Sequence, residues 1–482
     1  MNPRNKLRET VVIVLSISVL LIALSLKDSS FSIGDFKFKK VDLLSDIRTR
    51  SVFIEAPVTS PILTDSIIRT DRRFYQQKKL NPDAIKDFGN DSLPALACFF
   101  ESLFQTQQKK KKCRIAYFGD SMIEGDLVTQ DLRTSLQDSF GGVGVGFMPV
   151  TSIVAGFRQT IFHAFSGNWQ TYSLLDQNSP GHVLGITGYD FIPMYSPGKD
   201  SVDTGTGSWV RYSAVRRKRL NSFSNVRLFY GKTEGGGNYV HAAGRTLPLN
   251  GSQPVNTLEL LKSSPSQTVQ ADFQCSSLVN VFGFSMEGDS GLYLDNFSFR
   301  GNSGMPMTRI PQSVLSGLNK QLNYGLVILH YGVNVVSHQV TDFSWYEKGM
   351  TEVVLHIKAA MPNASILIIS TGDKSFYRDG AYTTDPSVPL VIEAQKRVAE
   401  KTGSAFWNLY EAMGGYNSMV KWVQGDTVLA NKDYTHPNFR GAKKIADLLY
   451  QQLMSDYRAF LKRREYEGAA AKLKVQDQEL KN

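Results

Sequence analysis

The sequence predicts an α/β fold with a second, β-rich domain inserted into it. Short apolar runs typical of buried strands lie at 113–118, 325–331 and 364–370. Helical spacing of apolar residues occurs near 127–138, 311–323, 344–360 and 388–401. Such alternation is typical of a sheet covered by helices. The stretch between the first two strand runs differs, because it is rich in Gly, Ser, Thr, Asn and aromatic residues.

Length and composition limit the class of protein. A chain of 482 residues suggests about three units at ~150 residues per domain. The 42% hydrophobic and 20% charged residues exclude a disordered, collagen-like or multi-span membrane protein. The net charge of +10 is modest for this length, so we expect no nucleic-acid partner. Three cysteines exclude a disulfide scaffold and an all-cysteine zinc site.

The N-terminus predicts export. The apolar stretch from Val11 to Leu26 follows three basic residues and is closed by Lys27. We interpret 11–27 as an uncleaved transmembrane signal anchor, with 1–10 in the cytoplasm and all later residues outside. A cleaved signal peptide is the alternative, and it exports the chain equally. Residues 28–90 have weak periodicity and are predicted to be a stalk or linker.

A candidate nucleophile lies in the turn between a predicted strand and a predicted helix. Ser92-Leu93-Pro94 is predicted to begin a helix, in which apolar residues recur from Leu96 to Phe104. The strand at 113–118 then runs into Gly119-Asp120-Ser121, and helical spacing resumes at 127. A serine in a turn between a strand and a helix is exposed at the carboxyl edge of the sheet, where a nucleophile can act. An ordinary helix N-cap is the alternative reading of Ser121.

A partner for this serine lies near the end of the chain. Asp433-Tyr434-Thr435-His436 precedes a long helical pattern from about 439 to 464. A general base needs an imidazole that a carboxylate holds in one tautomer, and one turn can present both groups at this spacing. A capping aspartate beside a surface histidine is the alternative.

Two further segments offer hydrogen-bond donors. Gly332-Val333-Asn334 ends the apolar run at 325–331, and Gly301-Asn302-Ser303-Gly304 forms a tight turn upstream of it. The Asn334 amide and a backbone N–H of that turn are suited to stabilise an oxyanion. The glycine-rich segment 141–146 lacks the context of a dinucleotide site, and we expect a flexible loop at the rim of the cleft. The seven histidines show no metal-binding spacing, so neither a metal nor another cofactor is expected.

Together these residues resemble the SGNH, or GDSL, hydrolase family. Gly119-Asp120-Ser121 resembles the first block of the family, Gly304 the second, Gly332-x-Asn334 the third and Asp433-x-x-His436 the fifth. The resemblance implies a three-layer α/β/α fold of flavodoxin-like type. It also implies that Ser121 is the nucleophile, His436 the base and Asp433 its orienting carboxylate. The Ser121 and Gly304 N–H groups and the Asn334 side chain would form the oxyanion hole.

The spacing of the blocks departs from a minimal family member. A domain-sized stretch separates Ser121 from Gly304, where a few tens of residues would suffice. Alternating runs at 208–213, 226–230, 279–284 and 291–297 predict a β-sandwich there. The arrangement is similar to Gram-negative peptidoglycan O-acetylesterases, which carry a carbohydrate-binding jelly roll at this place. The predicted parts are 91–152 and 300–462 for the hydrolase, 153–299 for the insert and 463–482 for a basic tail.

The sequence thus predicts an exported esterase that removes O-acyl, in particular O-acetyl, groups from a cell-envelope or extracellular polysaccharide such as peptidoglycan. The N-terminal segment, together with the resemblance to bacterial esterases, predicts a single-pass protein of the bacterial inner membrane, with its catalytic part in the periplasm or outside the cell. Two alternatives stay open. One is a polysaccharide O-acetyltransferase that uses the same triad, and the other is a glycan-binding protein without catalysis.

Overall fold

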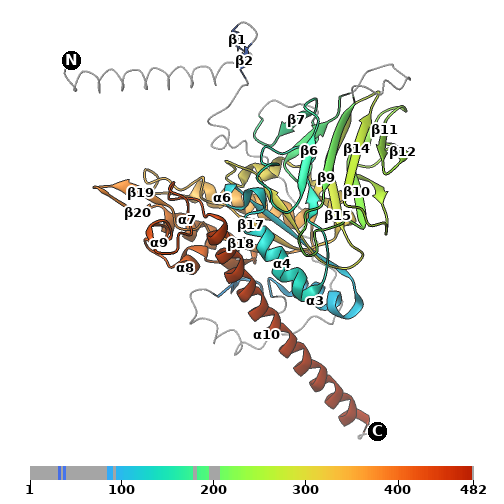
Figure 1. The fold of residues 1–482 in the computed structure, drawn as a ribbon. Coiled ribbons are helices and arrows are strands. Elements are labelled where there is room, and N and C mark those ends of the chain that lie inside the picture. The colour runs from blue at the N-terminus through green and yellow to red at the C-terminus, as the bar shows by residue number, and fades with distance from the viewer. Residues whose placement is uncertain are drawn as a thin grey trace, which may run out of the picture.

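The computed structural model describes residues 31–33, 36–38, 84–90, 94–176, 182–194 and 207–479, with side chains from 84 to 465. The residues from 84 on form an α/β domain and a β-sandwich that lie side by side (Figure 1), while β1 (Phe31–Ile33) and β2 (Phe36–Phe38) pair only with each other. The predicted anchor at 11–27, most of the stalk and the Ser92 cap lie outside these residues. None of the helices in the described part of the chain combines the length and the apolar character that crossing a membrane needs.

The α/β domain is built on one six-stranded sheet with the order β16-β4-β17-β18-β21-β3. The strands are β3 (Lys86–Asp87), β4 (Lys112–Gly119), β16 (Gly291–Ser298), β17 (Tyr324–His330), β18 (Ser365–Ile369) and β21 (Ala405–Trp407). All neighbours are parallel except β3, which pairs antiparallel with β21. The strand runs that the sequence predicts at 113–118, 325–331 and 364–370 are therefore confirmed as β4, β17 and β18.

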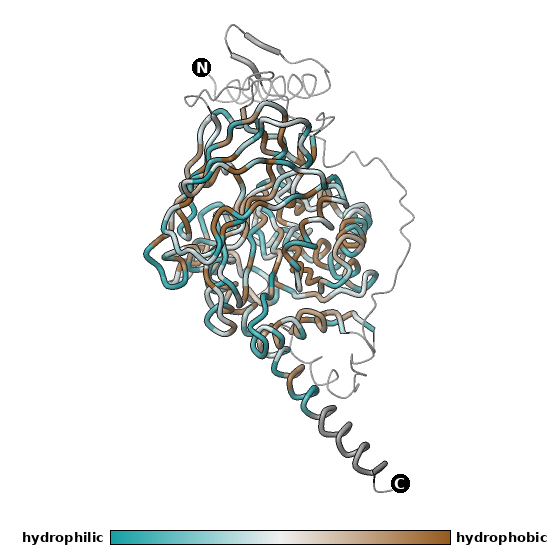
Figure 2. Tube along the Cα trace, turned by 90° about the vertical axis from the view of Figure 1, so that its right-hand side faces the viewer, coloured by the Kyte–Doolittle hydropathy of each residue, from teal (hydrophilic) through white to brown (hydrophobic). Residues whose placement is uncertain are grey.

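Helices cover both faces of this sheet, which confirms the three layers. One apolar core joins the sheet to α3 (Ala97–Lys109), α4 (Thr129–Phe140), α8 (Leu409–Met413), α9 (Ser418–Gln424) and α10 (Phe439–Glu479). The other joins it to α5 (Gln312–Leu322), α6 (Ser344–Ala360) and α7 (Val388–Thr402). Figure 2 shows hydrophobic residues interspersed with hydrophilic ones along the chain of both domains. The predicted tail continues α10 as far as Glu479.

The inserted domain is a sandwich of two antiparallel sheets around its own apolar core. One sheet has the order β13-β10-β15-β8-β7, with β5 paired to β15, and the other has the order β12-β11-β14-β9-β6. The strands are β5 (Gly146–Met148), β6 (Phe162–Phe165), β7 (Gln170–Ser173), β8 (Tyr189–Ile192), β9 (Ser208–Ser213), β10 (Asn225–Thr233), β11 (Tyr239–Ala242), β12 (Arg245–Pro248), β13 (Asn256–Leu261), β14 (Thr268–Gln274) and β15 (Val279–Glu287). The predicted runs at 208–213, 226–230 and 279–284 are confirmed as sandwich strands.

Two predicted boundaries of the insert are wrong. The run at 291–297 is not a sandwich strand but β16, which pairs in parallel with β4 over its whole length. Nearly all of its residues are buried, because helices and the insert cover both faces. Conversely, β5 precedes the predicted start at 153 yet pairs with β15 of the sandwich. The predicted stalk also contributes an element, since β3 closes the sheet at its far edge.

The glycine-rich segment 141–146 is also not a loop at the cleft. It lies at the amino end of the parallel sheet, where Leu292 donates to the Gly141 carbonyl at 3.0 Å. A Cβ on Gly142 would lie 2.4 Å from the Leu292 carbonyl oxygen, and Gly142 has a φ of +107°. The glycines are therefore needed for close packing where the chain passes from the hydrolase domain into the sandwich.

Candidate active site

The first candidate residue, Ser121, lies where the parallel sheet ends. Strand β4 stops at Gly119, and the short helix η2 (Ser121–Asp126) starts two residues later. A Cβ on Gly119 would lie 2.9 Å from the His330 carbonyl oxygen, so β4 and β17 need a glycine to stay this close. Asp120 caps η2 by accepting a hydrogen bond from the Met122 N–H at 3.0 Å. The side chain of Ser121 is left partly exposed at the carboxyl edge.

The loop before α10 brings the other two residues to this serine. Nε2 of His436 lies 2.8 Å from Oγ of Ser121, and Nδ1 of His436 lies 2.8 Å from Oδ2 of Asp433. The second oxygen of Asp433 accepts the N–H groups of Thr435 and His436 at 3.0 Å each. Ser121 and the distant pair Asp433 and His436 are thus joined in one chain of hydrogen bonds.

The hairpin formed by β19 (Ser375–Arg378) and β20 (Ala381–Thr384) contacts the loop that carries Asp433 and His436. The Tyr434 ring stacks on Tyr382 with a centroid distance of 3.5 Å, and the Ser375 N–H donates to the Tyr434 carbonyl at 3.0 Å. Tyr434 has a φ of +55°, which is uncommon for a tyrosine and is maintained by these contacts. The turn that carries Asp433 and His436 is therefore fixed by tertiary contacts.

The electrostatics of the pair suit a general base. Burial opposes ionisation of Asp433, but hydrogen bonds from His436 and Thr435 and the charge of His436 lower its pKa below the ordinary value. An ionised Asp433 accepts a hydrogen bond from the Nδ1–H of His436, which leaves the Nε2 lone pair facing the Ser121 hydroxyl. The arrangement can take a proton from the serine and return it to a leaving group.

The candidate oxyanion donors lie on two neighbouring loops. The registers pair Gly119 with Ser298 of β16 and with His330 of β17, so the loops after these strands start beside the serine turn. The exposed Asn334 amide donates one N–H to the Asn302 carbonyl at 3.1 Å. The amide carries a second N–H, which this contact does not use. The placement is compatible with the role predicted for Asn334.

The role predicted for Gly304 stays a prediction. Its N–H donates at 2.8 Å to the side-chain oxygen of Asn302, so it is already used within the turn. Gly304 has a φ of +95°, and a Cβ there would lie 2.8 Å from the Met350 sulfur, which explains the glycine without any catalytic role. Sequence reasoning missed Asn302, which is buried and connects both candidate donors. Its only signal was its place inside the glycine turn.

A second residue that sequence reasoning missed is Asp126, at the end of the serine turn. It is fully buried and binds Arg133 through two contacts of 3.2 Å, Thr129 at 3.2 Å, and Thr160. Arg158 lies 3.8 Å away and is also buried. Burial alone would raise the pKa of Asp126, but Arg133 and Arg158 lower it well below its usual range. Asp126 therefore ties the serine turn to α4 and to the loop at 151–161.

Asp120 has a different environment. Its carboxyl is fully buried, and burial raises its pKa to about 7 against weaker opposing effects from the Met122 N–H and from Lys374. One of its oxygens has no hydrogen-bond partner among the described residues. The structured parts of the chain contain no group of three acidic, histidine or cysteine side chains that could hold a metal ion.

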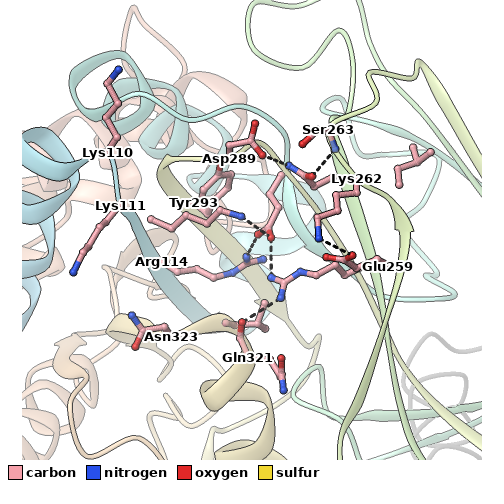
Figure 3. A pocket seen from close by; sticks show the side chains of 16 residues that line it. Lys110, Lys111, Arg114, Glu259, Lys262, Ser263, Asp289, Tyr293, Gln321 and Asn323 are labelled. Carbon is pink, nitrogen blue, oxygen red and sulfur yellow. Dashed lines mark hydrogen bonds and ion pairs between the residues drawn. The ribbon is translucent and has the colours of Figure 1, made fainter. Parts of the chain in front are cut away.

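A cavity of about 490 Å³ lies at the other end of the sheet, where the two domains meet (Figure 3). Its buried acid, Glu287, binds Lys112 at 3.0 Å and Arg227 at 2.7 Å, and it also pairs with Arg114. Lys110 and Lys111 point away from this cluster. The ion pairs fix β4 to the sandwich, and the cavity lies far from the edge that carries Ser121.

Comparison with known proteins adds to this picture. No model of a protein family and no curated protein matches the sequence. Among solved structures, a peptidoglycan O-acetylesterase matches at 22% identity with a TM-score of 0.63, over 78% of this chain and 99% of the other. An acetyl xylan esterase matches at 19% identity over 33% of this chain and 80% of the other, with a TM-score of 0.27. An esterase from Pseudoalteromonas sp. matches at 19% identity over 34% and 79%, with a TM-score of 0.26. The match to the peptidoglycan O-acetylesterase shows that this chain has the same fold as that enzyme, as the resemblance of its motifs implied.

Proposed function

We propose that this protein is a serine esterase that removes O-acyl, in particular O-acetyl, groups from a polysaccharide. The observation that carries the proposal is the hydrogen-bonded chain from Ser121 through His436 to Asp433, at the carboxyl edge of the parallel sheet. The solved relative of the same fold is a peptidoglycan O-acetylesterase, which supports an acetylated glycan as substrate class.

The geometry supports a two-step reaction. Oγ of Ser121 attacks the ester carbonyl while its proton moves to Nε2 of His436, and a tetrahedral oxyanion forms. The C–O bond to the sugar then breaks, and the sugar oxygen takes the proton from His436. Water gives a proton to His436 and attacks the acyl-serine. The acid is released, and Oγ of Ser121 regains its proton.

Hydrogen-bond donors must be in place before the negative charge of the oxyanion develops, so that they can stabilise it. The unused N–H of Asn334 and the backbone N–H of Ser121 are the donors that we assign to it. Asp433 stays ionised throughout and stabilises the imidazolium that forms in each step. The steps proposed here use only the hydroxyl, imidazole, carboxylate and amide groups named above and call for no cofactor.

We also propose that the catalytic part acts outside the cytoplasm, anchored in the bacterial inner membrane by 11–27. The support is the sequence alone: an apolar stretch preceded by Arg4, Lys6 and Arg8 and followed by Lys27. Membrane fractionation of full-length protein, with protease added to intact spheroplasts, tests this placement. Protection of the catalytic part from protease would contradict it.

Acetate release tests the activity itself. Full-length protein should hydrolyse p-nitrophenyl acetate and release acetate from O-acetylated peptidoglycan, whereas Ser121→Ala should do neither above background. A glycan that gains acetyl groups from a donor ester would instead identify an O-acetyltransferase. Glycan binding without any hydrolysis that depends on Ser121 would identify a binding protein.

A further inference from the structure

Two aromatic rings lie exposed beside the serine turn. Phe157, on the loop between β5 and β6, stacks on Phe439, the first residue of α10, with a centroid distance of 5.3 Å and an interplanar angle of 29°. Their exposed fractions are 45% and 36%. Single exposed apolar residues are normal on a protein surface, but these two rings are stacked on each other.

Both rings are close to the triad. A Cβ on Gly125 would lie 2.2 Å from Cδ1 of Phe157, so this ring packs directly on the backbone of the serine turn. Gly125 is four residues from Ser121, and Phe439 is three residues from His436. Even fully extended chain covers only ~14 Å and ~11 Å over such separations. The ring pair therefore bridges the segments that carry the nucleophile and the base.

The exposed ring of Phe157 is presented by an anchored loop. The next residue, Arg158, points into the interior, where it lies 3.8 Å from Asp126 and donates to the Met148 sulfur at 2.9 Å. Thr160 also donates to Asp126. Because these anchors follow Phe157 directly, the ring is held in place before any ligand binds, and binding costs little ordering entropy.

The position of the rings indicates which part of an ester they meet. The serine turn and the loop of His436 pack into the apolar core beneath α4 and α10, through Ile123 and Tyr434. The loop of Asn334, which supplies the side-chain donor to the oxyanion, packs into the opposite core, beneath α5, α6 and α7, through Val336. The acyl carbonyl must face the oxyanion donors, whereas the leaving oxygen must face His436. The rings lie on the side of the leaving group.

We propose that Phe157 and Phe439 form a platform for the sugar ring whose hydroxyl carries the acyl group. The idea rests on the proposed esterase function and names the part of the substrate that this site selects. The C–H face of a pyranose packs on aromatic rings, while its hydroxyl groups stay in water. The platform would favour esters of a ring-shaped alcohol over esters of a small alkyl alcohol.

The test compares two substrates that differ in the alcohol. One is O-acetylated peptidoglycan, measured by acetate release, and the other is ethyl acetate, which has no ring, measured in a pH-stat. Phe157→Ala and Phe439→Ala should each lower the ratio of kcat/KM for the glycan to kcat/KM for ethyl acetate by about tenfold, equivalent to ~1.4 kcal/mol. Phe157→Trp should keep the ratio because it keeps a flat ring. Phe157→Leu, which keeps only apolar volume, should not.

The control is Leu355→Ala, which removes an apolar side chain of 54% exposure from α6. It should leave the ratio at the wild-type value. An unchanged ratio in both phenylalanine variants would overturn the platform while wild-type hydrolysis of the glycan still supports the esterase. A change in preference between ethyl butyrate and ethyl acetate, with the glycan ratio unchanged, would place the rings against the acyl chain and also refute the proposal. Absence of any Ser121-dependent hydrolysis would refute the function itself.

Discussion

Replacing Asp126 with asparagine should destabilise the α/β domain by about 3–5 kcal/mol, because two buried guanidinium groups would lose their shared counter-charge. Asp126 has no exposed side-chain surface, and the side chains of Arg133 and Arg158 are only 2% and 5% exposed. Water therefore cannot replace the lost carboxylate. The asparagine keeps the shape of the side chain, so the change isolates the charge.

The sign of the pH dependence follows from the pKa of Asp126, which lies well below its usual range in the folded state. A depressed pKa contributes stability above the unfolded-state pKa, and this stability is lost as the pH falls through the folded-state pKa. The difference between wild type and Asp126→Asn should therefore be full from pH 8 down to about pH 4, the ordinary pKa of an aspartate.

Urea unfolding followed by tryptophan fluorescence measures this difference. Trp407 and Trp422 are buried in the α/β domain and report on its transition. Asp138→Asn is the matched control, because Asp138 also has two cationic partners, Lys218 and Arg219, but its side chain is 44% exposed. The control should lose no more than about 1 kcal/mol. Equal losses in the two variants would refute the reasoning that burial of the arginines sets the cost.

Three further predictions concern the residues around the serine. Asp433→Asn should lower kcat by orders of magnitude with an unchanged fold, because the imidazole loses its orienting carboxylate; kcat near wild type on p-nitrophenyl acetate would remove Asp433 from the triad. Asn334→Ala should lower kcat by ~10²–10³ with little change in KM or Tm, because its free N–H acts on charge that develops in the transition state; a lower Tm with normal kcat would show a structural amide. Burial raises the pKa of Asp120 to about 7, so the folded state keeps this proton to a higher pH than the unfolded chain does. Wild type should therefore lose stability as the pH rises from about 4 to about 7, and Asp120→Asn should remove this contribution to the loss. Unfolding curves at several pH values check the last prediction, and an unchanged slope would contradict it.

The spacing of apolar residues along the chain was sufficient to predict the helices that bury one face. The helices α5, α6 and α7 occur within two residues of the ranges that apolar spacing predicts, because one buried face imposes that spacing. The sequence indicates Ser121 because this serine follows a predicted strand. It indicates Asp433 and His436 because both precede a long predicted helix. The distances between them confirm that these positions meet.

The oxyanion side was harder to predict. Gly304 occupies the expected block, yet its N–H is bound by Asn302, a contact between residues of one turn that depends on a φ of +95°. The predicted strand at 291–297 was assigned to the wrong domain for a related reason. Alternation indicates a strand but not its hydrogen-bond partners, and only long-range pairing with β4 places β16 in the parallel sheet.

The sequence by itself determined the strands β4, β17 and β18, the helices α5, α6 and α7, the presence of a β-rich insert and the three residues of the hydrogen-bonded chain, since each depends on short-range spacing. The tertiary structure alone decided where the insert begins and ends, how Asp126 holds two buried arginines, and that Phe157 meets Phe439 beside the serine. Those features depend on contacts between residues that are distant in the chain. No local propensity encodes such contacts, because their stability comes from burial and charge pairing that exist only after the two domains have packed.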